Sequence, residues 1–96
     1  MINSSNRKKL RALAHHLDPS IIIGKNGYNE GVKISIEEVL NKKELIKIKF
    51  NEYKSSKKTL SKNIEKDTNS HIVGIIGNIT ILYRQNEDLE NRIVLK

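Results

Sequence analysis

Three segments of the chain carry apolar residues at the spacing of one helical face. The first spans residues 4–16, the second follows a good N-cap residue, Asn29, and ends near Asn41, and the third spans residues 54–69. Their expected core-facing residues are, in chain order, Leu10, Leu13, Ala14 and Leu17; Val32, Ile36, Val39 and Leu40; and Leu60 and Ile64. Pro19 ends the first helix, and Ser55 or Ser56 is the expected cap of the third. We therefore predict three amphipathic helices, of which the third has the thinnest apolar stripe.

Four apolar or alternating runs lie between and after these helices. They are residues 21–23, 45–50, 72–76 and 79–84. In the second run, Ile46, Ile48 and Phe50 alternate with Lys47 and Lys49, which predicts a strand with one basic face. The dipeptide Gly77-Asn78 predicts a two-residue II′ hairpin between the last two strands. Gly74 predicts a bulge or a close backbone approach.

The predicted order of elements is α-β-α-β-α-β-β. Strands joined through helices favour parallel pairing by right-handed crossovers, and the closing hairpin makes the sheet mixed, with the helices over its apolar faces. The chain has 96 residues and no visible repeat or linker, so we expect one α/β domain over residues 1–96. Its core spans about residues 4–84, and we assign no function to the tail, residues 85–96.

Composition narrows the choice of partner. The chain has 18 Lys and Arg against 11 Asp and Glu, a formal net charge of +7, which favours a polyanionic partner. It has no cysteine, which excludes disulfides, thiolate metal sites and a cysteine nucleophile. No apolar run approaches the roughly 20 residues that span a bilayer, and residues 1–6 contain no signal-peptide core. We therefore expect a soluble, cytoplasmic protein with no membrane partner.

The apolar run at residues 21–23 ends in Gly24-Lys25-Asn26-Gly27, shortly before the second helix. Two glycines three apart let the backbone adopt positive φ and approach a ligand closely, and the following helix offers unpaired N–H groups. Lys25 adds a mobile positive charge, so the stretch is similar to the Gly-x-x-Gly loop with which KH domains clamp a nucleic-acid backbone. A tight strand-to-helix turn with nothing bound is the alternative interpretation.

Other polar side chains have two interpretations each. The basic face of the first helix, Arg7, Lys8 and Arg11, is either a solvated surface or an extension of the positive loop. The lysines of residues 54–66 are likewise either a solubilising surface or a second phosphate-contacting patch. Tyr83 and Arg84 either stack on an unpaired base, or close the core and pair with a surface acid.

Two adjacent histidines, His15 and His16, end the first helix. Neighbouring residues diverge by about 100° on a helix and no third ligand is evident, so we expect no metal site. Histidines near a helix C-terminus commonly interact with the last carbonyl groups, and we expect this of at least one of the two.

Four stretches of the chain, taken together, resemble the motifs of a known domain family. They are Leu10-Arg11-Ala12-Leu13-Ala14-His15, residues 19–27 (PSIIIGKNG), residues 44–49 (ELIKIK), and the segment from Gly77 through Leu82-Tyr83-Arg84. In order and spacing they resemble the CRM domain (chloroplast RNA splicing and ribosome maturation) in its single-domain bacterial form, the YhbY family. Tyr28 stands where that family commonly has leucine, and Asn29 where it has threonine. Asn29 can still cap the helix, whereas Tyr28 either packs inward or offers a stacking surface.

The resemblance implies a two-layer sandwich with a mixed four-stranded sheet, similar to the C-terminal domain of a bacterial translation initiation factor. It also implies RNA binding through residues 24–27 and association with precursors of the large ribosomal subunit. We therefore expect a monomeric, non-enzymatic RNA-binding protein with no metal and no cofactor. The residues expected to contact RNA are Gly24, Lys25, Asn26, Gly27, Tyr28, Arg7, Lys8, Arg11, Lys47, Lys49 and Arg84.

Two other classes of function compete with this one. The first is an enzyme that holds a nucleotide phosphate in the glycine loop, but the chain lacks a Walker pattern and a dinucleotide fingerprint. The second is an adaptor whose positive charge recruits an acidic protein or an anionic membrane.

Overall fold

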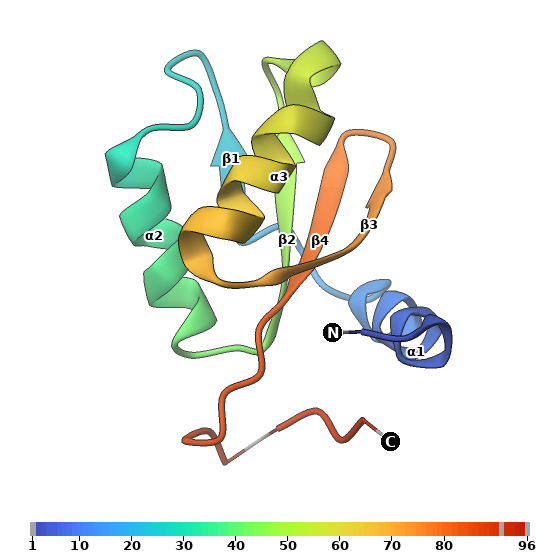
Figure 1. The fold of residues 1–96 in the computed structure, drawn as a ribbon. Helices are drawn as coiled ribbons and strands as arrows, with labels where there is room; N and C mark the ends of the chain where they lie inside the picture. The colour runs from blue at the N-terminus through green and yellow to red at the C-terminus, as the bar shows by residue number, and fades with distance from the viewer. Residues whose placement is uncertain (1, 91, 96) are drawn as a thin grey trace.

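Four strands form one mixed sheet (Figure 1). In the computed structural model, which describes residues 2–90 and 92–95, the strands are β1 (Ile21–Ile23), β2 (Leu45–Phe50), β3 (His71–Ile76) and β4 (Ile79–Tyr83), in the order β1-β2-β4-β3. β1 runs parallel to β2, whereas β4 is antiparallel to both of its neighbours. The ends of β1 and β2 and the β3–β4 turn therefore lie at the same end of the sheet, which we call the loop end.

Helices lie on both faces of this sheet. They are α1 (Ser4–Ala14), α2 (Glu30–Leu40) and α3 (Lys57–Thr68), the last preceded by a 3-10 turn, η1 (Lys54–Ser56). α2 and α3 cover one face, with a core of Ile23, Ile36, Leu40, Ile46, Ile48, Phe50, Ile64 and Leu82. α1 covers part of the other face, with a core of Ile2, Leu10, Ala14, Leu45, Val73, Ile81 and Tyr83.

The adjacent residues Leu45 and Ile46 belong to different cores because successive side chains of a strand point to opposite faces. The α/β class, the element order and the mixed four-stranded sheet are thus confirmed. The sheet with α2 and α3 makes two layers, and α1 adds a partial third layer on the other face.

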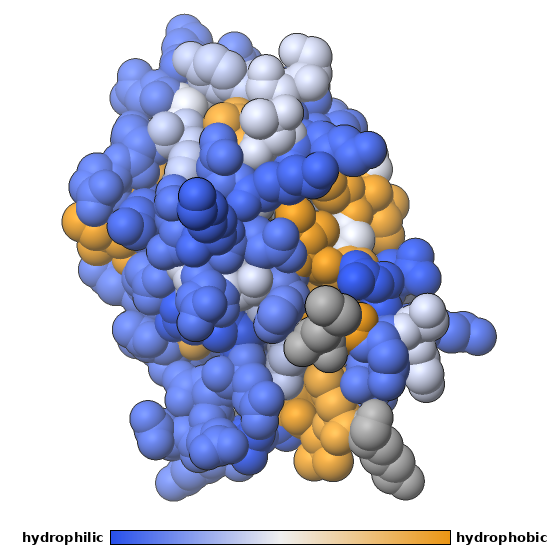
Figure 2. Space-filling model, viewed as in Figure 1, coloured by the Kyte–Doolittle hydropathy of each residue, from blue (hydrophilic) through white to orange (hydrophobic). Residues whose placement is uncertain are grey.

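The outer surface of the α2 and α3 layer is mainly hydrophilic, and hydrophobic residues gather toward the β3 side of the molecule (Figure 2). None of the described helices combines the length and the apolar character that a bilayer span requires.

α1 buries a narrower stripe than its sequence predicts. Leu10 and Ala14 are fully buried and Leu17 is half-buried, but Leu13 is 43 % exposed, so its predicted place in the core is wrong. Leu13 lies about 80° around the helix from the midpoint between Leu10 and Ala14. A helix that covers only part of a sheet face buries the centre of its stripe and leaves such a flanking residue in solvent.

The helix caps follow the prediction in part. The Asn29 side chain accepts a hydrogen bond from the Val32 N–H (3.0 Å), as expected of the cap of α2. Asn3 caps α1 in the same way, through the Asn6 N–H (2.8 Å). Ser56 precedes α3 but makes no capping bond with its side chain. The 3-10 turn leads the chain into this helix instead.

The hairpin and the bulge are confirmed. Ile76 pairs with Ile79 across the two-residue turn, and Gly77 has a φ of +58°, which suits the first position of a II′ turn. The register shifts between Ile72 and Gly74. One guanidinium nitrogen of Arg7 donates to the Ile72 and Val73 carbonyls at 2.7 and 2.8 Å, so Arg7 stabilises the bulge from α1.

The tail is tied to the start of β2 by a buried carboxylate. Glu44 is 3 % exposed and accepts hydrogen bonds from the backbone N–H groups of Asn86 and Ile93. The Arg92 guanidinium lies 3.7 Å from the same carboxylate, and Ile93 packs against the core under α1. Part of the tail therefore belongs to the folded domain.

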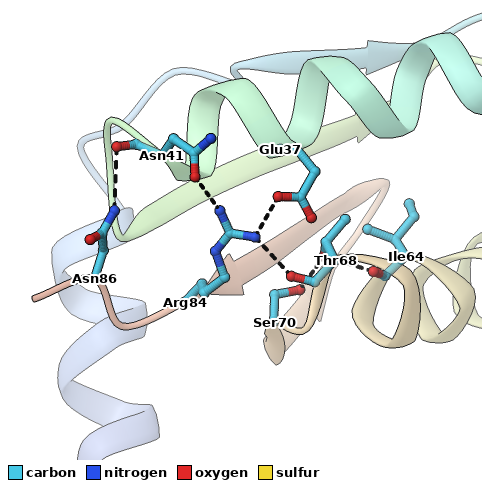
Figure 3. Close-up of polar contacts among 7 residues, drawn as sticks. All are labelled: Glu37, Asn41, Ile64, Thr68, Ser70, Arg84 and Asn86. Atoms are coloured by element: carbon cyan, nitrogen blue, oxygen red, sulfur yellow. Dashed lines mark hydrogen bonds and ion pairs between the residues drawn. The ribbon is translucent and has the colours of Figure 1, made fainter. Parts of the chain in front are cut away.

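Arg84 joins three elements at the end of the sheet opposite the loop end (Figure 3). Its Nη1 donates to the Glu37 carboxylate at 2.8 Å and to the Thr68 carbonyl at 2.9 Å, and its Nη2 donates to Asn41 Oδ1 at 2.9 Å. Asn41 caps the C-terminal end of α2, and Thr68 is the last residue of α3. One cation therefore satisfies groups at the C-terminal ends of two helices, where positive charge is favourable.

Replacing Arg84 by Gln should lower the free energy of unfolding by roughly 2 kcal/mol, because hydrogen bonds that involve charged groups contribute about 1.5–3 kcal/mol. The Arg84 side chain is only 18 % exposed, so water replaces these bonds poorly. Urea unfolding followed by circular dichroism measures the change.

Arg11→Gln is the matched control for this substitution. Arg11 is exposed and its guanidinium has no hydrogen-bond partner among the described residues, so its loss should change stability by no more than about 0.5 kcal/mol. Equal destabilisation by the two substitutions would contradict the role given to Arg84.

Candidate nucleic-acid interface

The Gly-Lys-Asn-Gly stretch forms a closed turn after β1. The Gly27 N–H donates to the Gly24 carbonyl at 3.0 Å, and Gly27 has a φ of +69°. Gly27 therefore needs its conformational freedom, and its N–H is not available to a ligand. Lys25 and Asn26 form the tip of the turn, and both are exposed. Their N–H groups, unlike that of Gly27, donate to no other described residue, so they are the donors that this loop offers to a phosphate.

The N-terminus of α2 contributes less than its sequence suggests. The Asn29 side chain already accepts the Val32 N–H, and the carboxylate of Glu30 lies in the first turn. An anion near this helix end would meet a capped helix that carries its own negative charge. The turn at residues 24–27 therefore offers the better phosphate site.

Tyr53 holds the turn from the side. Its hydroxyl donates to the Lys25 carbonyl at 2.8 Å, and its ring edge lies where a side chain on Gly27 would begin, with Cε2 only 3.2 Å from the position of a Cβ atom. Sequence reasoning missed this residue. The signal that could have found it is a single aromatic residue in the polar stretch between β2 and α3.

Tyr28 packs inward. It is half-buried against the core under α2 and α3, and its hydroxyl donates to Asp67 at 2.8 Å. Burial, and then the hydrogen bond to Asp67, raise the pKa of the Tyr28 phenol above its ordinary value. Tyr83 is only 5 % exposed. Neither ring is therefore available for stacking on a base.

The structure separates the basic candidates into two groups. Lys8, Arg11, Lys25 and Lys49 are exposed, and their charged groups have no hydrogen-bond or ion-pair partner among residues 2–90 and 92–95. Arg7, Lys47 and Arg84 bind within the protein. Arg7 stabilises the bulge, Lys47 donates to the Leu17 carbonyl at 2.9 Å, and Arg84 lies far from the loop end.

Four of the basic candidates lie along one face of the molecule. Lys49 pairs with Ile22, two residues before the turn, and points to the same face as Lys47. Beside it, a shallow hollow of about 130 Å³ is lined by Arg11, His15, Lys47, Ile76, Ile79 and Ile81. Lys8 follows one turn back on α1, at i−3 from Arg11. Positive charge thus extends from the loop end across the sheet to α1, on the face opposite α2 and α3.

His15 is the C-cap residue of α1 through its backbone N–H, which donates to the Arg11 and Ala12 carbonyls at 3.2 and 3.3 Å, but neither histidine side chain makes such a bond within the described part of the chain. His15 and His16 are exposed and pack their rings edge to face, with centroids 5.3 Å apart. Lys47 supplies the side-chain donor at this helix end, to the His15 and Leu17 carbonyls, so the expected interaction is met by the backbone of His15 and not by a histidine side chain. A lysine from β2 can bind these carbonyls because its long side chain reaches the helix end while its charge stays near solvent.

Residues 2–90 and 92–95 contain no group of three or more His, Asp or Glu side chains that could hold a metal ion.

Comparison with known proteins places the chain in a family. The family model for the CRS1 / YhbY (CRM) domain matches residues 2–84. A protein of Haemophilus influenzae named RNA-binding protein is 35 % identical, and the match covers 99 % of this chain and 97 % of that one. The Bacillus subtilis protein YqeI, named as a probable RNA-binding protein, is 32 % identical, with 92 % and 93 % covered.

The fold is also that of a solved structure. The solution structure of a hypothetical protein from Staphylococcus aureus, described as a candidate RNA-binding protein, has a TM-score of 0.79 to this chain. It is 34 % identical, and the match covers 92 % of this chain and 93 % of that one. The sequence match over residues 2–84 and the shared fold lead to one conclusion: the chain belongs to the CRS1/YhbY (CRM) domain family.

Proposed function

We propose that this protein binds RNA through the turn at residues 24–27 and the exposed cations beside it. The observation that carries the proposal is the turn itself, which presents two backbone N–H donors and Lys25 at a tip that Tyr53 holds in place. Backbone N–H groups and a lysine together are a suitable phosphate site. The names of the relatives, which describe RNA-binding proteins, support the same ligand.

The exposed cations extend the proposed binding surface beyond the turn. Lys49, Arg11 and Lys8 continue from Lys25 along the face that α2 and α3 do not cover. Each can meet a phosphate without first breaking a contact inside the protein. Lys47 and Arg7 add positive charge from fixed positions. Tyr28 and Arg84 support the interface only through the fold.

The finer role that we propose is a non-enzymatic one in assembly of the large ribosomal subunit, with precursor ribosomal RNA as the partner. It rests on the resemblance to the YhbY family and on a site that offers donors and positive charge. Crosslinking in cells followed by sequencing of the attached RNA tests it. Enrichment of precursor RNA of the large subunit is the expected result, and enrichment of unrelated RNA would contradict this role while leaving RNA binding intact.

Binding should weaken steeply with salt. A single-stranded RNA releases counterions when protein cations neutralise its phosphates. Each phosphate contact therefore adds roughly −0.7 to the slope of log affinity against log salt concentration. Three or four contacts predict a slope of roughly −2 to −3. Fluorescence anisotropy of a labelled oligonucleotide between low and moderate salt measures this slope. A slope near zero would reject the electrostatic contacts.

The turn can be tested by reversing its charge. Replacing Lys25 and Asn26 together by Asp places two anions where the phosphate would lie, and should weaken RNA binding at least roughly tenfold. Lys25→Ala removes one charge but keeps the N–H donors, so it should weaken binding less and reduce the salt slope by about 0.7. Both positions are exposed, so the fold should survive.

The chain provides a matched control at Lys62 and Asn63, an identical Lys-Asn pair that is exposed on α3. Replacing this pair by two Asp residues changes the net charge by the same amount, two units from lysine and one from asparagine. If general basicity causes binding, both double variants will lose affinity equally. If the turn binds phosphate, only the variant at residues 25 and 26 will lose most of it.

A further inference from the structure

We propose that Tyr53 stacks on one unpaired base of the RNA strand whose phosphate lies at the turn. The inference rests on the proposed function. It adds to the phosphate contact at the turn a second contact, between an aromatic ring and an unpaired base, that does not depend on charge. Tyr53 lies outside the four stretches that resemble the CRM domain.

The Tyr53 ring is fixed in place without being buried. Its hydroxyl donates to the Lys25 carbonyl, and its Cε2 and Cζ atoms lie 3.2 and 3.3 Å from the position of a Cβ atom on Gly27. The residue nevertheless remains 48 % exposed. A ring that is oriented beforehand loses little side-chain entropy when a ligand covers its free surface.

The backbone around Tyr53 is held in an unusual conformation. Tyr53 has a φ of +57°, the left-handed region that costs a bulky side chain about 1–2 kcal/mol. Both Asn51 and Glu52 donate their N–H groups to the Ile23 carbonyl, and the Ser56 N–H donates to the Tyr53 carbonyl. These bonds keep the segment beside the turn. A strained residue that its neighbours hold in place is a reasonable candidate for a direct role in binding.

Among the tyrosines and the phenylalanine, Tyr53 is the ring that remains available. The chain has three tyrosines, one phenylalanine and no tryptophan. Tyr28 is half-buried and bonded to Asp67, and Tyr83 and Phe50 are buried. Stacking of a base on an aromatic ring is worth about 1–3 kcal/mol and accepts any base, which suits a strand bound mainly through its phosphates.

The test separates stacking from a purely structural role of Tyr53. Binding is measured for a single-stranded oligouridylate and for a ribose-phosphate strand of the same length that lacks bases. The parent protein should prefer the oligouridylate by roughly tenfold, within the range expected for one stacked base. Tyr53→Phe keeps the ring and should keep this preference.

Tyr53→Leu should bind the two strands equally, with the salt slope of the parent because no charge has changed. If the ring only supports the turn, Tyr53→Leu will weaken the binding of both strands by the same factor. The preference of the parent will then persist in the variant, which overturns the inference.

Failure of the parent to bind either strand at low salt would reject RNA binding itself. A parent that binds both strands equally would reject stacking and leave the phosphate site standing.

A third variant adds a readout that does not depend on comparing affinities. Tyr53→Trp introduces the sole tryptophan of the chain. Stacking should quench its emission with oligouridylate and leave it unchanged with the baseless strand. Equal emission changes with both strands would contradict stacking even if the affinities differ.

Discussion

The parallel pairing of β1 with the end of β2 is the contact on which the loop end depends. Ile23 lies opposite Phe50, both side chains are fully buried, and the Ile23 carbonyl accepts the N–H groups of Asn51 and Glu52. This pairing brings the turn at residues 24–27 next to the segment that contains Tyr53. A three-residue strand can hold this position because its last side chain is anchored in the core.

Positive charge serves two purposes in this domain. At Arg7, Lys47 and Arg84 it satisfies backbone carbonyls at a bulge and at the ends of α1 and α3, and a side-chain oxygen at the end of α2, which stabilises the fold. At Lys8, Arg11, Lys25 and Lys49 the charge is exposed and has no partner among residues 2–90 and 92–95. The net charge of +7 therefore does not distinguish the cations that stabilise the fold from those that can form new contacts with a partner.

Most of the fold could be predicted from sequence patterns that lie within single helices, strands and turns. The apolar stripe of α2, the alternation in β2, the two-residue hairpin and the bulge at Gly74 could all be read from the sequence, since each depends on neighbours along the chain. The sequence could not show which groups Arg84 binds, or that Tyr53 lies beside the turn. Both depend on which distant segments pack together, and a lone arginine or tyrosine looks the same whether its partner is the protein or a ligand.

Arg84 joins the two helices of one layer at one end only. Arg84 connects the C-terminal ends of α2 and α3, whereas the N-terminal ends of the two helices follow the turn and the Tyr53 segment (Figures 1 and 3). Both helices therefore share one fixed point, far from the loop end. The turn and Tyr53 are held instead by their bonds to each other and by the bonds of Asn51 and Glu52 to the Ile23 carbonyl. Stability and ligand binding can therefore be altered separately, the first at the Arg84 end of the sheet and the second at the loop end.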